Sequence, residues 1–180
     1  MSKKVLVISA SPRKNGNSDI LCDEFIKGAK ESGNSVEKIF LKDKNINFCT
    51  GCGYCANNGY IGCSQKDDMT ELVDKMISSD VIVMATPVYF YTMNAQMKVF
   101  IDRCCSKYTS IKNKEFYFIA TAAESERKML DRTFDGFRGF LDCLDGAVEK
   151  QCIYAPGVWQ KGEVKNTPAM QEAYKAGLSL

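Results

Sequence analysis

The feature that most constrains the fold is a regular alternation of short apolar runs with segments of helical periodicity. Apolar residues recur every three or four positions between the runs, as in the segment with Leu21, Phe25 and Ala29. Because strands that alternate with helices form βαβ units, the pattern predicts a flavodoxin-like, doubly wound α/β sheet of five parallel strands with helices on both faces. The five runs are "KVLVIS" from Lys4, "SVEKIFL" from Ser35, "DVIVMAT" from Asp80, "EFYFIATA" from Glu115 and "AVEKQCIYA" from Ala147.

Three local signals predict where elements begin and end. Gly33 follows the first helical segment, at the position where a left-handed residue commonly ends a helix. Asp68, with Glu71 three residues later, resembles a capping box and predicts a helix start. Pro87 predicts the end of the third strand, because proline lacks the N–H that a strand ladder uses.

Composition excludes several classes of function. The chain has 180 residues, 45% of them hydrophobic, which predicts a single domain over residues 1–180. A net charge of +2 without a basic stripe disfavours nucleic acid, and the apolar runs are too short for a membrane span. The chain has no histidine, which excludes Ser-His-Asp and Cys-His catalysis and histidine metal ligands. Nine cysteines without a secretion signal predict a reducing, cytoplasmic location.

The loop after the first strand, "SASPRKNGNS", is a candidate phosphate site. Ligands of doubly wound sheets bind beyond the carboxyl ends of the strands. The loop offers the hydroxyls of Ser9, Ser11 and Ser18, the amide of Asn17 and the cation of Arg13, just where a helix starts. Free N–H groups at a helix N-terminus favour a phosphate. The alternative is an ordinary polar turn in which Asn17 or Ser18 only caps the helix.

The segment after the third strand, "TPVYFYTMNAQ", places three adjacent aromatic side chains where a ligand is expected. Aromatic faces and backbone amides suit a flat heterocycle. The alternative is that these side chains pack into a neighbouring helix or a subunit interface. At least one of the three is expected to be exposed, since three adjacent residues cannot all point inward.

"SASPRKNGNS", "TPVYFYTMNAQMKVFIDR" and the pattern C-x-G-C-x-x-C…G-C…DDM between them resemble the flavodoxin-like NAD(P)H-dependent FMN reductases, and within them the iron–sulfur flavoproteins. The resemblance implies strand order 2-1-3-4-5 and FMN as cofactor. It implies a phosphate site at Ser11, Arg13, Asn17 and Ser18. It also implies that Pro87, Val88, Tyr89 and Phe90 flank the isoalloxazine, and that Thr121 and Ala122 approach its other edge.

Four cysteines fall in a loop insertion at about residues 42–67, with the spacing C-x2-C-x2-C-x7-C: Cys49, Cys52, Cys55 and Cys63. Soft thiolates gathered this tightly suit a 4Fe-4S cluster, which the resemblance also implies. Free or redox-active thiols are the alternative. Zinc is the weaker metal hypothesis, because structural zinc sites more often separate two C-x-x-C units widely. The loop leaves the second strand beside the first, so it is expected at the flavin's edge of the sheet and within electron-transfer reach of the flavin.

These expectations favour an FMN-dependent oxidoreductase. Electrons would pass from NAD(P)H or a ferredoxin-like donor to a quinone, an azo or nitro compound, a flavin or an oxygen species. Two alternatives stay open: an electron carrier that does not turn over, and a thiol or metal sensor. The exposed aromatics and the long cysteine loop also predict a homo-oligomer, either a dimer or a tetramer.

Overall fold

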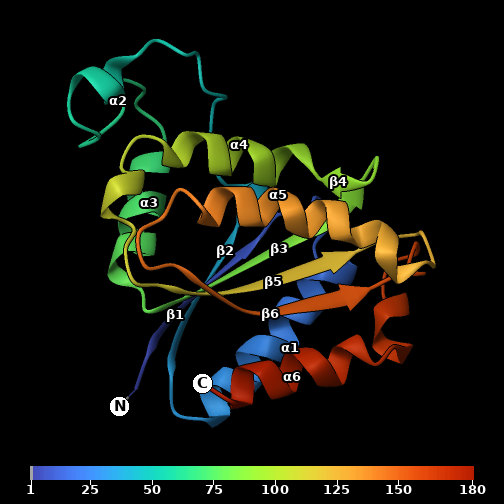
Figure 1. Cartoon of the computed structure of the whole chain (residues 1–180). Helices are drawn as coiled ribbons and strands as arrows, with labels where there is room; N and C mark the ends of the chain where they lie inside the picture. The colour runs from blue at the N-terminus through green and yellow to red at the C-terminus, as the bar shows by residue number, and fades with distance from the viewer. Residues whose placement is uncertain (1) are drawn as a thin grey trace.

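Five parallel strands form the centre of the molecule in this computed structural model, which describes residues 2–180. Their order is β2-β1-β3-β5-β6 (Figure 1), which is the predicted order 2-1-3-4-5 of the five long strands. A short strand, β4, pairs antiparallel with β3, so the sheet has six strands rather than the predicted five. The strands are β1 (Lys4–Ser9), β2 (Ser35–Phe40), β3 (Val81–Tyr89), β4 (Thr92–Met93), β5 (Glu115–Thr121) and β6 (Val148–Ala155).

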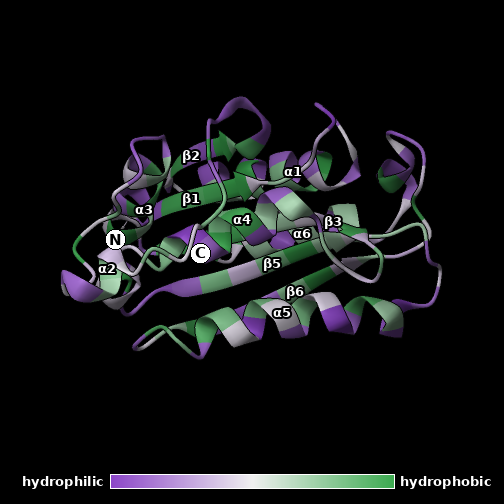
Figure 2. Ribbon diagram, turned by 90° about the horizontal axis from the view of Figure 1, so that it is seen from above, coloured by the Kyte–Doolittle hydropathy of each residue, from purple (hydrophilic) through white to green (hydrophobic). Residues whose placement is uncertain are grey.

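Helices cover both faces of the sheet, as predicted (Figure 1). One layer is α1 (Asn17–Glu31) with α6 (Ala169–Leu178), and the other is α3 (Met69–Ser78), α4 (Ala95–Cys104) and α5 (Asp131–Leu141). Hydrophobic residues concentrate on the central strands between these layers (Figure 2). The shorter helices are α2 (Tyr54–Asn57) and the 3₁₀ turns η1 (Leu41–Asp43), η2 (Tyr108–Ser110), η3 (Arg127–Leu130) and η4 (Glu163–Asn166).

Burial on both faces explains the continuous apolar sequence of the central strands. Residues 81–85 of β3 are all fully buried, because α1 lies against one face of the sheet and α3 and α4 against the other. Within residues 2–180, no helix combines the length and the apolar character that crossing a bilayer requires.

The local signals had mixed outcomes. Gly33 has φ +85° just beyond α1, as predicted for the residue that ends the helix. The helix start predicted at Asp68 is confirmed, since α3 begins at Met69, but the capping box is wrong, because Asp68 makes no side-chain capping bond. The preceding residue caps instead: an oxygen of the Asp67 carboxylate accepts from the N–H of Met69 at 3.2 Å.

The prediction that Pro87 ends the third strand is also wrong, because β3 continues to Tyr89. The last pair between β1 and β3 is Ser9 with Ala85, whereas pairing with β5 continues to Pro87 and Thr121. At Pro87 the β1 side of the strand therefore has no partner, and the missing N–H costs no ladder bond.

Candidate functional site

Three loops that the sequence analysis selected meet at the carboxyl edge of the sheet. They follow β1, β3 and β5, which are direct neighbours in the strand order. The pairing of β1 with β3 ends at Ser9 and Ala85, and the pairing of β3 with β5 ends at Pro87 and Thr121. The candidate site is the surface that these three loops form.

The N-terminus of α1 is the most polar part of this surface. The first N–H groups of α1 have no carbonyl partner within their own helix, as in any α-helix. Gly16, which precedes the helix, has no side chain that could cap them. The Oγ of Ser18 is buried and has no hydrogen-bond partner in the protein. An unsatisfied hydroxyl beside free amides at the positive end of a helix dipole fits an anion such as a phosphate.

Gly16 gives this turn its close packing. A Cβ at Gly16 would lie 2.7 Å from the Oγ of Ser11 and 2.9 Å from the carbonyl oxygen of Arg13. Any larger residue would push these groups apart. The Ser11 hydroxyl donates to the same carbonyl at 2.7 Å, which fixes the loop over the helix start.

Ser9, one of the predicted phosphate residues, is already engaged by a residue of α1. The hydroxyl of Ser9 donates to Asp19 at 3.1 Å, and the other oxygen of Asp19 accepts from the N–H of Asn15 at 2.9 Å. Lys38 on β2 lies 2.7 Å from the same carboxylate. Asp19 thus orders the loop, a role that the sequence analysis missed because Asp19 lies within the helix.

The side chain of Asn17 holds the segment that follows β6. Its amide donates to the carbonyl oxygen of Gln160 at 2.9 Å, and its oxygen accepts from the N–H of Gly162 at 2.9 Å. Arg13 is exposed and donates to the carbonyl oxygen of Trp159 at 3.3 Å. The segment at residues 159–164 therefore borders the phosphate-type loop, although Asn17 and Gln160 are 143 positions apart in sequence.

The aromatic residues form the tip of a hairpin between β3 and β4. Phe90 and Tyr91 have φ values of +49° and +64°, as in a tight turn with left-handed central residues. Phe90 is 101% exposed, and Tyr89 and Tyr91 are 46% and 45% exposed. The prediction of an exposed aromatic is confirmed, and all three side chains are exposed.

Asn94 joins the loops at their base. It caps α4 by accepting from the N–H of Met97 at 3.2 Å, and its amide donates to the carbonyl oxygen of Ala10 at 2.6 Å. Its N–H donates to the hydroxyl of Thr86 at 3.1 Å. This buried network fixes the hairpin relative to the β1 loop.

Thr121 and Ala122 lie buried at the end of β5. The N–H of Ala122 donates to Ala155 at 3.0 Å, and its carbonyl oxygen accepts from Val158 at 2.8 Å. The backbone here is tied to β6 and its following loop, so these residues form part of the floor of the site.

The cysteine loop does not lie at this edge, which corrects the sequence-based expectation. It leaves β2 at the carboxyl edge but crosses to the C-terminal end of α4 (Figure 1). There the Arg103 guanidinium donates to the carbonyl oxygen of Asn47 at 2.6 Å, and the rings of Tyr60 and Tyr108 lie 5.0 Å apart. The ten residues of α4 span about 15 Å, so the loop contacts lie that far from the N-terminal end of the helix, which follows the hairpin. Arg103 holds the loop there, and the length of the loop allows the crossing.

The four cysteines do not form a metal site in this conformation. Within residues 2–180, no three potential histidine, cysteine or carboxylate ligands converge on one point. Cys52 faces Ser64 at 3.6 Å, Cys63 faces Arg103 at 3.6 Å, and Cys55 faces a fifth cysteine. The thiols fit an iron–sulfur cluster in kind and number but not in arrangement.

The remaining cysteines lie in the core, in a strand or at helix ends. Cys22 and Cys104 are buried in the two core clusters, and Cys152 lies half-buried in β6. Cys105 and Cys143 are exposed, at the ends of α4 and α5.

Solved structures share this architecture over nearly the whole chain. An NAD(P)H:quinone oxidoreductase from Methanothermobacter marburgensis superposes with a TM-score of 0.79 at 15% identity, covering 99% of this chain and 97% of that chain. An FMN-dependent NADH-azoreductase from Bacillus anthracis in complex with FMN has a TM-score of 0.72 at 19% identity, covering 98% of each. At these identities the likeness establishes the fold alone, which is a flavodoxin-like α/β sheet.

The family model described as NADPH-dependent FMN reductase matches residues 3–143. The chain therefore belongs to the NADPH-dependent FMN reductase family. Among curated relatives, an iron-sulfur flavoprotein of Archaeoglobus fulgidus is 46% identical over 100 residues, covering 56% of this chain and 44% of the relative. An iron-sulfur flavoprotein of Methanosarcina thermophila is 34% identical over 114 residues, covering 62% and 59%. The chain spans about half the length of the curated relatives that it matches.

Proposed function

We propose that this protein binds FMN at the carboxyl edge of its sheet and passes electrons from NAD(P)H to a small acceptor. The observation that carries the proposal is the start of α1, where the buried Oγ of Ser18 lacks a partner beside free helix amides. Membership of the FMN reductase family supports the same reaction class.

In this proposal the phosphate of FMN accepts from Ser18 and from the first amides of α1. Arg13 contributes charge, and Ser11 keeps the loop closed around Gly16. Ser9 and Asn17 act through their neighbours, since Ser9 bonds Asp19 and Asn17 holds the segment at residues 159–164. Charge-assisted bonds of this kind contribute about 1.5–3 kcal/mol each.

The hairpin would hold the flavin ring. Pro87, Val88, Tyr89 and Phe90 provide a backbone edge and aromatic surface on one side, and Thr121 and Ala122 close the floor. The flavin itself supplies hydride and electron transfer, which is why the absence of histidine poses no difficulty. The protein's contribution is to bind and orient the flavin and to exclude water from its face.

Small acceptors are favoured over protein substrates. The names of the structural neighbours include a quinone oxidoreductase and azoreductases, which act on small molecules. Quinones, azo or nitro compounds, flavins and oxygen species are all candidates, and a ferredoxin-like donor is the alternative to NAD(P)H.

Turnover of NAD(P)H distinguishes this proposal from an electron carrier, and loss of activity without flavin distinguishes it from a thiol sensor.

We also propose that Cys49, Cys52, Cys55 and Cys63 bind one 4Fe-4S cluster after the cysteine loop rearranges. The support is the donor set and the iron-sulfur flavoprotein name of several relatives. Anaerobic reconstitution with iron and sulfide, followed by electron paramagnetic resonance of the reduced protein, tests this. Absence of a signal in the reconstituted wild type, or an equal signal from Cys52→Ser, refutes it.

Assembly into a homo-oligomer is part of the proposal. The hairpin exposes three aromatic side chains beside the proposed flavin site, and burying them against a second copy would remove apolar surface from water. Light scattering of the flavin-bound protein measures the assembly. A monomer at micromolar concentration contradicts it.

The phosphate site is tested by the double variant Arg13→Ala/Ser18→Ala. Loss of a single such contact lowers FMN affinity about ten- to a hundredfold, so the double variant is expected to bind FMN at least that much more weakly, as measured by quenching of FMN fluorescence. Lys14→Ala is the matched control, because Lys14 is an exposed cation of the same loop. If the double variant binds FMN as tightly as the control does, the phosphate lies elsewhere.

A further inference from the structure

A fifth cysteine, outside the four-cysteine motif, lies against the cysteine loop. Cys105 caps the C-terminal end of α4, and its Sγ is 3.8 Å from the Sγ of Cys55 in the short helix α2. The two residues are 50 positions apart in sequence. Their proximity is therefore a product of the tertiary fold.

Two further contacts keep the loop at this place. The ring of Tyr60 packs edge-on against that of Tyr108 at 5.0 Å. The Arg103 guanidinium donates to the carbonyl oxygen of Asn47 at 2.6 Å. Arg103 lies two residues before Cys105, at the same end of α4. Because both contacts flank the thiol pair, the high local concentration of Cys55 at Cys105 does not depend on the thiols themselves.

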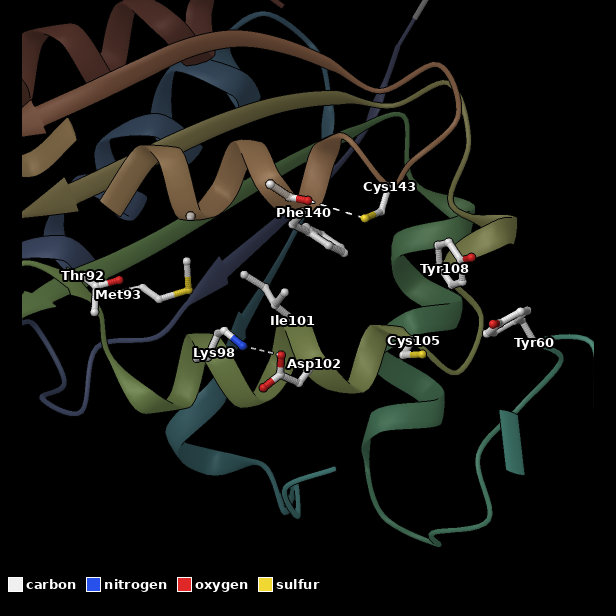
Figure 3. A pocket seen from close by; sticks show the side chains of 12 residues that line it. Tyr60, Thr92, Met93, Lys98, Ile101, Asp102, Cys105, Tyr108, Phe140 and Cys143 are labelled. Carbon is white, nitrogen blue, oxygen red and sulfur yellow. Dashed lines mark hydrogen bonds and ion pairs between the residues drawn. The ribbon is translucent and has the colours of Figure 1, made fainter. Parts of the chain in front are cut away.

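The pair is accessible to small molecules. Cys105 is exposed and Cys55 is half-buried. Cys105 also lines a cavity of about 610 Å³ between α4 and α5, with Tyr60 and Tyr108 at the same end (Figure 3). A disulfide requires the sulfurs to approach to about 2.05 Å, so the observed separation of 3.8 Å must close by about 1.8 Å.

We propose that Cys55 and Cys105 form a reversible disulfide, with a low-molecular-weight disulfide as the oxidant. The thiolate of Cys55 attacks one sulfur of the oxidant, which gives a mixed disulfide and releases one small thiol. The thiolate of Cys105 then attacks the sulfur of Cys55 and releases the second small thiol. Two protein thiols are oxidised, one small disulfide is reduced, and the two protons leave with the released thiols.

This bond fastens the cysteine loop to α4 and removes Cys55 from the four-cysteine set. The oxidised protein cannot offer four free thiols to a metal. Oxidation of the pair would thus prevent the cysteine loop from binding a cluster. This consequence rests on the proposed cluster, whereas the disulfide itself does not depend on that proposal.

The test is a peptide map of the full-length protein after treatment with oxidised glutathione. Trypsin places Cys55 in the peptide of residues 45–66 and Cys105 in that of residues 104–107. The expected result is a disulfide-linked pair of these peptides that reduction removes. The link is lost in Cys105→Ser and kept in Cys143→Ser, the control for an exposed cysteine that lines the same cavity. Should Cys105→Ser fail to fold, Cys55→Ser gives the same loss.

Three outcomes overturn the disulfide. The first is that the oxidised wild type yields no linked peptides. The second is that a Cys52–Cys55 disulfide forms within the peptide of residues 45–66 instead. The third is that the link persists in Cys105→Ser, through the neighbouring Cys104. Iron uptake separates the two proposals: the oxidised protein takes up none, and the reduced protein takes it up. If the reduced protein takes up no iron either, the cluster proposal fails, and the peptide map alone decides the disulfide.

Discussion

The buried ion pair between Asp67 and Arg103 is expected to hold the cysteine loop to the sheet domain. The side chains are 0% and 2% exposed, and the carboxylate accepts from the guanidinium at 2.7 Å and 2.9 Å. Burial by itself would raise the pKa of Asp67, but hydrogen bonds from Arg103 and from the N–H groups of Asn47 and Met69 outweigh it and lower the pKa to about 2. We expect Asp67→Asn to destabilise the protein and to loosen the loop.

The magnitude follows from the pKa of Asp67. Lowering it from the ordinary 3.8 to about 2 corresponds to about 2 kcal/mol of unfolding free energy at pH 7. Because the folded pKa is depressed, this stabilisation is fully present above the unfolded pKa and is lost as the pH falls through the folded pKa. About 1 kcal/mol of it is gone at pH 3, halfway through that window.

Urea denaturation at pH 7 and pH 3 measures the difference between wild type and Asp67→Asn. The matched control is Asp102→Asn, which breaks the exposed Lys98–Asp102 pair on α4 and is expected to cost less than about 0.5 kcal/mol. A difference below about 1 kcal/mol at pH 7, or one that does not shrink at pH 3, would show that the pair does not stabilise the fold in this way.

Three further predictions concern the site and the thiols. Gly16→Ala is expected to weaken FMN binding more than it lowers the melting temperature, because the added Cβ displaces the loop at the helix start; equal FMN affinity would contradict the close fit. Asn94→Ala removes a helix cap and leaves buried groups unsatisfied, so urea denaturation should show a loss of about 1–3 kcal/mol, and a loss near zero would refute the network's role. Iodoacetamide at pH 7.5 should modify Cys52 long before Cys104, since a hydrogen bond from the Tyr54 N–H lowers the pKa of Cys52 and burial raises that of Cys104; comparable rates would contradict this.

The sequence by itself determined the architecture and the edge of the sheet that carries the candidate site. Continuous apolar runs such as Val81–Ala85 can only be buried on both faces, and helical segments between them force parallel crossovers. Because the strands are parallel, their carboxyl ends all meet at the same edge of the sheet. The positions of the loops after β1, β3 and β5 therefore follow from the sequence pattern alone.

Only the tertiary structure decided which side chains remain free for a ligand. The side chains of Ser9 and Asn17 are of the kind that binds phosphate. Ser9 is instead hydrogen-bonded to Asp19, and Asn17 to the segment at residues 159–164. These partners are brought together by the fold, and no local pattern records a contact between Asn17 and a residue 143 positions away.

The position of the cysteine loop was likewise decided by packing. Its starting point followed from β2, but its path depends on Arg103, whose buried pairing with Asp67 draws the loop to the far end of α4. A sequence motif fixes the spacing of Cys49, Cys52, Cys55 and Cys63 along the chain. The direction in which a long loop folds is set by a few distant contacts, and for this reason Cys55 meets Cys105 and not its own motif partners.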